Sequence, residues 1–103
     1  MVTRETRKLG KQQYGDMVAL VKRVIAEWDP YALLASGSPH DEFDSEVASI
    51  VAQFPRIKSA TDAAHVISRV FASSFVPTNF TPESCAQVGK QLFAAFRANG
   101  FVA

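Results

Sequence analysis

The segment YGDMVALVKRVIAEW, residues 14–28, gives the clearest indication of secondary structure in this chain. Its apolar residues recur every three or four positions, which places them on one face of an α-helix. Pro30 follows at once. Because proline lacks a backbone donor and clashes with the preceding turn, the helix is expected to end near Trp28. The expected core face consists of Tyr14, Met17, Leu20, Val21, Val24, Ile25 and Trp28.

A second long helix is expected from Pro39 to Phe54. Ser38 precedes a proline and is a typical cap, and Asp41 stands where the acid of a capping box reaches back to the helix start. Pro55 then ends the helix. The apolar positions that share its core face are Phe43, Val47, Ile50, Val51 and Phe54.

Two further helices are indicated by the same kinds of signal. Ser59-Ala60-Thr61-Asp62 places a capping serine before an acidic first turn, which predicts the start of a third helix. Thr81-Pro82-Glu83 predicts the start of a fourth, and Asn99-Gly100 is typical of a helix end. The expected core residues are Ala63, Val66, Ile67, Val70, Phe71 and Phe75 in the third helix, and Cys85, Val88, Leu92, Phe93 and Phe96 in the fourth.

The pattern of the whole chain is helical. No segment alternates apolar and polar residues between turn signals as a half-buried β-strand does. Asp29-Pro30 resembles one more helix start, which predicts a short helical turn over residues 30–35. The sequence therefore predicts an all-α protein, a compact four-helix domain with an extra short helical turn between the first two helices.

Length and composition indicate one domain. The chain has 103 residues, 48% of them apolar, which is enough for one core and too little for two. Residues 1–13 are basic and lack helical spacing, so we expect a basic flexible arm there and a single helical domain over 14–103. No apolar run approaches the roughly 18 residues that a membrane span requires. The single cysteine, Cys85, is compatible with a reducing, cytoplasmic location.

Charge is distributed unevenly along the chain. Residues 24–55 contain no lysine or arginine and six carboxylates, a formal charge of −6, whereas the other 71 residues carry +7. Such polarisation bears on what the surface attracts rather than on the fold. The six acidic residues are Glu27, Asp29, Asp41, Glu42, Asp44 and Glu46.

Two interpretations of this acidic segment are open. On the second long helix, Glu42 and Glu46 are one turn apart on one flank, with Asp44 on the other. Acids near a helix start suit the helix dipole and need no further role. Alternatively, they form a contact surface for a basic partner, with an aromatic anchor beside them. The candidate partner-binding residues are Tyr31, Asp41, Glu42, Asp44 and Glu46.

The sequence contains only weak signals for metal binding or catalysis. His40 and Asp44 are four residues apart and could share a helix face, but no third metal ligand stands at a recognised spacing. Cys85 lies on an apolar face and is expected to be buried and inert, while His65 is expected at the edge of the core. No phosphate-binding loop or nucleophile motif occurs. We therefore expect no catalytic residue, no metal and no cofactor.

Two clusters of residues carry a resemblance to a known family. They are Trp28-Asp29-Pro30-x-x-Leu33-Leu34 and Gly37-x-Pro39-x-Asp41-Glu42-Phe43-Asp44-x-Glu46. With them the chain resembles the YugE-like family of small bacterial helical proteins, over about residues 20–96. The resemblance implies a compact helical fold in a bacterial setting. Family members commonly have tyrosine at the position of Phe43, so one hydroxyl is missing here.

The leading hypothesis is a cytoplasmic protein-binding module, namely an immunity protein that neutralises a basic toxin. Small bacterial proteins of this kind are plausible immunity proteins by analogy. A nuclease surface must be cationic to hold phosphate, and an acidic partner is steered onto such a surface. The sequence leaves two alternatives: a regulatory or homo-oligomeric helical protein, and an enzyme that uses His40 and carboxylates with a metal.

Overall fold

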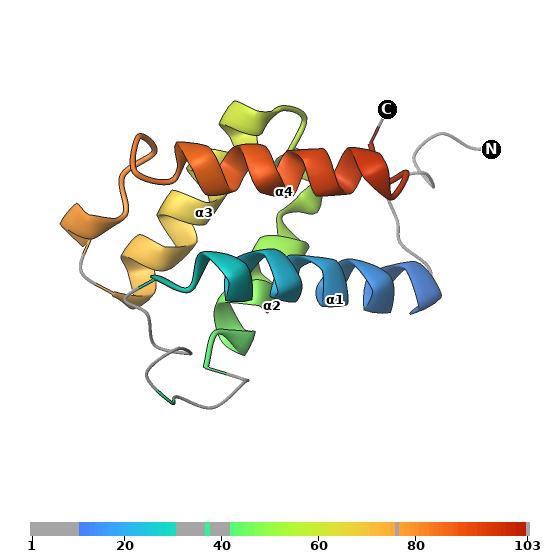
Figure 1. Ribbon diagram of the computed structural model, residues 1–103, viewed down its shortest axis with the longest axis horizontal. Helices are drawn as coiled ribbons and strands as arrows, with labels where there is room; N and C mark the ends of the chain where they lie inside the picture. Colours follow the sequence, from blue (N-terminus) through green and yellow to red (C-terminus); the bar gives the residue numbers. More distant parts are fainter. Residues whose placement is uncertain (1–10, 31–36, 38–41, 76, 103) are drawn as a thin grey trace.

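The computed structural model describes residues 11–30, 37, 42–75 and 77–102. Over these residues the chain forms four α-helices and two short 3₁₀-helices and no β-strand, which confirms the all-α prediction (Figure 1). The α-helices are α1 (Lys11–Trp28), α2 (Asp44–Ala52), α3 (Ala60–Ser74) and α4 (Ala86–Ala98), and the 3₁₀-helices are η3 (Phe54–Arg56) and η4 (Pro77–Asn79).

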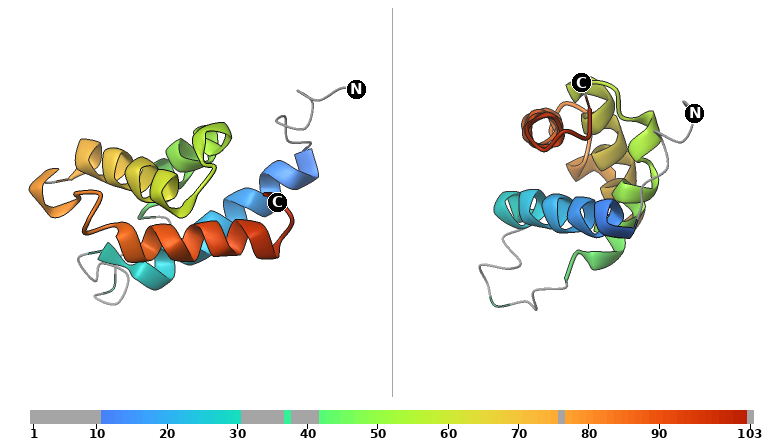
Figure 2. Two further views of the ribbon diagram at one scale, coloured as in Figure 1. Left: turned by 90° about the horizontal axis from the view of Figure 1, so that it is seen from above. Right: turned by 90° about the vertical axis from the view of Figure 1, so that its right-hand side faces the viewer.

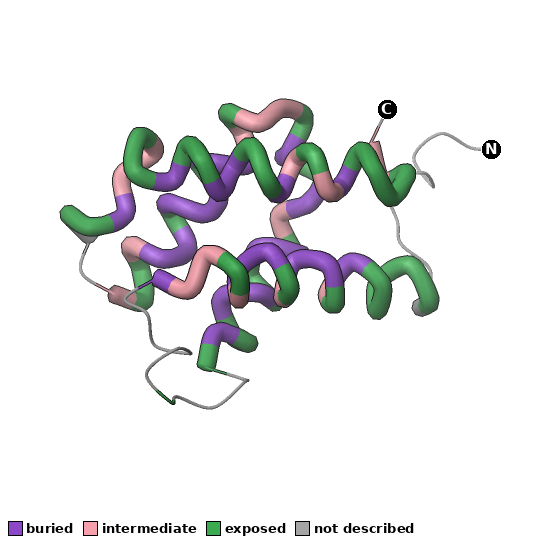
Figure 3. The backbone as a smooth tube through the Cα atoms, viewed as in Figure 1, coloured by how far each residue is buried: buried purple, intermediate pink, exposed green. Residues whose placement is uncertain are grey.

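The four helices enclose one core. α1 contacts α2 and α4, and α3 contacts α2 and α4, so the four contacts close a ring. α1 and α4 lie in front of α2 and α3 in Figure 1, and the view from above in Figure 2 shows the same two layers. Buried positions line the inner side of each helix (Figure 3). This arrangement matches the amphipathic spacing of the sequence.

α1 differs from its expected form at its beginning. It starts at Lys11, three residues before the expected start at Tyr14. Tyr14 was assigned to the core, and this is wrong, because its side chain is 48% exposed. Residues 12–16 are all exposed, since the first turns of α1 extend past the helices that cover the rest of it (Figure 3). The remaining face packs as predicted, with Met17, Leu20, Val21, Val24 and Ile25 buried.

α2 is shorter than the helix expected from Pro39 to Phe54. It begins at Asp44 after a turn at Glu42 and Phe43, and it ends at Ala52 before the 3₁₀-helix that contains Pro55. Its predicted core face is confirmed, since Phe43, Val47, Ile50, Val51 and Phe54 are all buried. Ser38, Pro39 and Asp41, the expected start signals, lie outside the described residues, as do residues 31–35 of the expected short helical turn.

α3 begins where the sequence predicted. Ser59 has extended backbone angles, and its hydroxyl accepts a hydrogen bond of 3.1 Å from the backbone N–H of Asp62. The Asp62 carboxylate in turn accepts a bond of 2.9 Å from the backbone N–H of Lys58. These bonds satisfy donors that a helix start leaves without partners. The predicted core residues Ala63, Val66, Ile67, Val70 and Phe71 are buried.

α4 ends where the sequence predicted, but its regular helix starts later than the Thr81-Pro82-Glu83 signal indicated. Thr81 and Ser84 exchange side-chain bonds with each other's backbone N–H, at 3.1 and 3.0 Å, in the manner of a capping box. The α-helix itself starts at Ala86. At the other end, Gly100 has a φ of 78°, and the N–H of Phe101 donates to the carbonyl of Phe96 at 2.9 Å. This is the Schellman geometry that glycine favours.

Aromatic side chains join the ends of several helices. Trp28, at the end of α1, meets Phe71 of α3 edge-on, with ring centroids 5.1 Å apart, and meets Phe80 at 6.0 Å. Phe43 and Phe75 also pack against Phe71, at 5.8 Å each. The expected structural role of Trp28 is therefore confirmed. This cluster holds two points of the acidic segment, Trp28 and Phe43, against α3.

Candidate partner-binding surface

The predicted contact residues occupy different environments. Glu42 is exposed in the turn before α2, and Asp44 is exposed at the first position of that helix. Glu46, one turn further, has only 8% of its surface exposed. Glu42 and Glu46 therefore do not form an equally exposed pair. Tyr31 and Asp41 lie outside the described residues.

Asp44 has a cation beside it that the sequence did not indicate. The Nζ atom of Lys22, on α1, lies 3.1 Å from Oδ1 of Asp44. The two side chains are 43% and 54% exposed, so the pair contributes about 0–1 kcal/mol to stability. Because the two residues are far apart in sequence, only the packing of α1 on α2 brings them together. The ion pair offsets part of the local negative charge.

Glu46 faces a polar groove between α2 and α3. The groove has a volume of about 240 Å³ and is lined by Ser45, Glu46, Ser49, Gln53, Arg69, Val70, Ser73 and Ser74. Glu46, Ser49 and Gln53 follow one line along the chain because positions three and four apart share a helix face. α3 supplies Arg69, which is exposed. The groove thus combines one carboxylate, one guanidinium, four hydroxyls and one amide.

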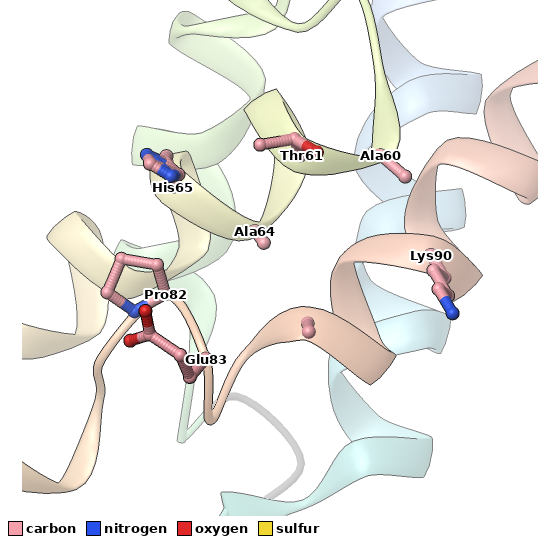
Figure 4. A pocket seen from close by; sticks show the side chains of 8 residues that line it. Ala60, Thr61, Ala64, His65, Pro82, Glu83 and Lys90 are labelled. Carbon is pink, nitrogen blue, oxygen red and sulfur yellow. The ribbon is translucent and has the colours of Figure 1, made fainter.

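A second hollow lies between the first turns of α3 and the start of α4 (Figure 4). Its volume is about 270 Å³, and alanines from both helices line it together with Pro82. His65 and Glu83 stand at one end and Lys90 at the other (Figure 4). His65 is exposed, outside the core boundary where the sequence placed it. The hollow is more apolar than the α2–α3 groove, with charged groups at its edge.

Cys85 is buried, as predicted. It is the N-cap residue of α4 and has no exposed surface. Burial raises the pKa of the thiol, and the nearby Ser84 hydroxyl, 4.0 Å from Sγ, lowers it to a smaller extent. A thiol with a raised pKa stays protonated at neutral pH and is a poor nucleophile. Cys85 is therefore a core residue.

The described residues contain neither a group of metal ligands nor a helix that could span a membrane. Among the described positions, no three histidine, cysteine, aspartate or glutamate side chains come close enough together to hold a metal ion. His40 lies outside the described residues. Over the part of the chain that the structure describes, no helix combines the length and the apolar character needed to cross a lipid bilayer.

The fold and the acidic segment define a small all-α domain with a charged surface around α2. The chain belongs to the DUF1871 family, described as a domain of unknown function, which it matches over residues 20–99. No curated protein and no solved structure matches it. The matched region contains the acidic segment and all of α2, α3 and α4, and it begins within α1.

Proposed function

We propose that this protein is a protein-binding module whose acidic segment recognises a basic protein partner. The observation that carries the proposal is the charge distribution: residues 24–55 hold six carboxylates and no lysine or arginine. Of these, Glu27, Glu42 and Asp44 are exposed among the described residues. An exposed charge of one sign steers an oppositely charged partner and fixes its orientation.

The partner that suits this surface best is a toxin with a cationic active site, such as a nuclease domain. The protein would then be a cytoplasmic immunity protein that neutralises the toxin by covering that site. A nuclease must present cations to bind phosphate, so an acidic inhibitor competes directly with its substrate. The resemblance of the chain to the YugE-like proteins supports a bacterial setting for such a pair. Binding, rather than catalysis, is the proposed activity.

The contact residues are expected to contribute unequally. Glu42 is exposed and forms no ion pair within the described part of the chain, so it is available to a partner. Asp44 already contacts Lys22, and a partner must compete with that ion pair. Tyr31 and Asp41 remain predictions, as an aromatic anchor and a further acid. Charge reversal at Glu42 is therefore the clearest test of the surface.

The test begins with a pull-down from the native host at low salt, using the full chain. We expect a basic protein that dissociates as salt is raised, and whose nuclease activity the chain inhibits. Glu42→Lys should weaken binding and inhibition at least several-fold. Glu83→Lys is the control, because it reverses an exposed charge at the start of α4, outside the acidic segment. Equal binding by both variants, or a captured protein that the chain does not inhibit, would reject the proposal.

The same charge distribution favours one other function, a homo-oligomeric or regulatory protein. The acidic segment carries −6 and the remaining residues +7, so one copy could bind another through opposite charges. Sedimentation velocity at low and high salt separates the two functions. A dimer that dissociates on adding salt, and that Glu42→Lys disrupts, would favour self-association over a toxin partner.

A further inference from the structure

Glu46 is a largely buried residue whose carboxylate has no protein partner among the described residues. The residue is more than nine-tenths buried, yet it makes no hydrogen bond or ion pair within the described part of the chain. Each described side-chain oxygen or nitrogen that is cut off from solvent has a hydrogen-bond partner. The small exposed area of Glu46 therefore includes its carboxylate oxygens, at the α2–α3 groove that the residue lines. A carboxylate held in this way favours a cation that enters the groove.

The groove offers a cation more than one ligand. Ser45, Ser49 and Gln53 line it from α2, and Ser73 and Ser74 from α3. A hydroxyl or an amide oxygen accepts hydrogen bonds from a guanidinium or an ammonium group. The volume of about 240 Å³ is below the roughly 300–1,000 Å³ of sites for drug-sized ligands, and suits a single long side chain.

Arg69 is the cation that competes for this position. It lines the groove from α3 and is exposed, and it forms no ion pair with Glu46. Burial holds the Glu46 side chain in place, whereas the Arg69 side chain is exposed, so the carboxylate is the charge whose position in the groove is fixed. Arg69 can turn toward water as a cation enters.

We propose that the α2–α3 groove receives the cationic end of an arginine or lysine side chain from a basic protein partner, with Glu46 as its counter-ion. This rests on the proposed function, because it names a second contact of the same basic partner. It also assigns Glu46 a role different from that of Glu42, as an anchor within a groove rather than as part of a steering surface. Buried anchors of this kind carry much of the energy of an interface.

Neutralising the two charged residues of the groove should change the affinity for a cation in opposite directions. Glu46→Gln keeps the shape of the side chain and removes the charge, so it should weaken binding of a cation about tenfold. Arg69→Gln removes a repelling charge and should strengthen the same binding by a few-fold. A ligand with both a positive and a negative end would instead lose affinity in both variants. The signs therefore separate a cationic side chain from a zwitterion.

The experiment is an NMR titration of the full, ¹⁵N-labelled chain with N-acetyl-L-arginine amide. We expect saturable shifts in the amides of residues 45–53 and 69–74, and none with the neutral isostere N-acetyl-L-citrulline amide. Glu83→Gln is the matched control, because it removes an exposed carboxylate outside the groove and should leave the affinity unchanged. Thermal unfolding of each variant checks that the fold is intact.

Several results would overturn the groove proposal. They are equal shifts with citrulline amide, shifts centred outside the groove, an unchanged affinity in Glu46→Gln, and weaker binding in Arg69→Gln. The probe needs no partner, so this outcome is separate from that of the pull-down. If a basic inhibited partner is found but the probe does not bind, the proposed function stands and the groove proposal fails. If the probe binds but no basic partner exists, the proposed function fails.

Discussion

Ser68 is a buried polar residue whose hydrogen bond fixes a loop. It lies on the inner side of α3, only 7% exposed, and its hydroxyl donates to the backbone carbonyl of Phe80 at 2.6 Å. Buried hydroxyls are costly unless they are hydrogen-bonded, and this one ties the segment before α4 to α3. This contact could not be predicted from the sequence, because a serine at a core position appears there only as an interruption of the apolar spacing.

Removal of the Ser68 hydroxyl should lower stability. We expect Ser68→Ala to reduce the free energy of unfolding by about 1 kcal/mol, since it removes one buried hydrogen bond. Urea denaturation measures the change. Ser73→Ala is the control, because the Ser73 hydroxyl is exposed and bonds only to the Arg69 carbonyl of its own helix. An equal loss in the two variants would mean that the bond to Phe80 contributes nothing specific.

The contact between α3 and α4 depends on a glycine. A Cβ atom placed on Gly89 would lie 2.7 Å from the backbone N and 2.8 Å from the Cα of Ala64. These are backbone atoms, which cannot move aside like the end of a flexible side chain. α3 and α4 must therefore separate to admit any side chain at position 89, and the α3–α4 hollow shares this contact through Ala64.

Gly89→Ala should therefore destabilise the protein although alanine favours helices. Overpacking costs about 1–3 kcal/mol, and contacts below 3.0 Å with backbone atoms place this substitution toward the upper end, above the gain of roughly 1 kcal/mol from helix propensity. Gly15→Ala is the matched control, since it is a helical glycine with nothing within 4 Å of the added Cβ, and it should raise stability. Thermal or urea unfolding compares the two. Stabilisation by both substitutions would show that α3 and α4 are not in close contact.

Helix faces could be predicted from the sequence, whereas helix starts and contacts between helices were harder. Spacing is local, so Val47, Ile50 and Val51 were assigned to the core correctly without knowledge of their neighbours. The first regular residue of α2 depends on how the preceding turn packs, and it came at Asp44 rather than Pro39. Tyr14 has the spacing of a core residue in α1, but its side chain is exposed because no other helix covers that end of α1.

The candidate site shows the same division between local and non-local information. The excess of acid in residues 24–55 is visible in the sequence. The burial of Glu46 against α3, and the ion pair of Asp44 with Lys22, arise only when separate helices pack together. No signal in the sequence links Arg69 or Lys22 to the acidic segment. Charge was therefore predictable from the sequence, but its pairing and exposure were not.

The four helices share one core, so a single buried group can influence the stability of the whole protein. Cys85 has no exposed surface and is part of the core cluster that draws on all four helices. Its pKa is raised in the folded protein, chiefly by desolvation. In the unfolded chain the thiol ionises with a pKa of about 8.5. The folded state therefore holds its proton at a pH where the unfolded state releases it.

This difference determines how stability depends on pH. Below about pH 8.5 both states are protonated and the contribution of Cys85 is complete. Above that pH the thiol ionises in the unfolded state, which lowers the free energy of that state. The free energy of unfolding should therefore fall, by up to roughly 1.4 kcal/mol per pH unit, until the folded thiol also ionises. In Cys85→Ala, which removes the titrating group, this component of the decline should be absent. At neutral pH that variant is less stable than the wild type because of the cavity.

Urea unfolding from pH 6 to pH 10.5 measures the effect as the difference between wild type and Cys85→Ala. We expect a constant difference up to about pH 8.5 and a narrowing difference above it. Tyrosine and lysine residues titrate in the same range in both proteins, so they cancel in the difference. A difference that stays constant to pH 10.5 would mean that the thiol ionises equally in the folded and unfolded states. Cys85 would then have access to water, which would contradict its place in the core between the four helices.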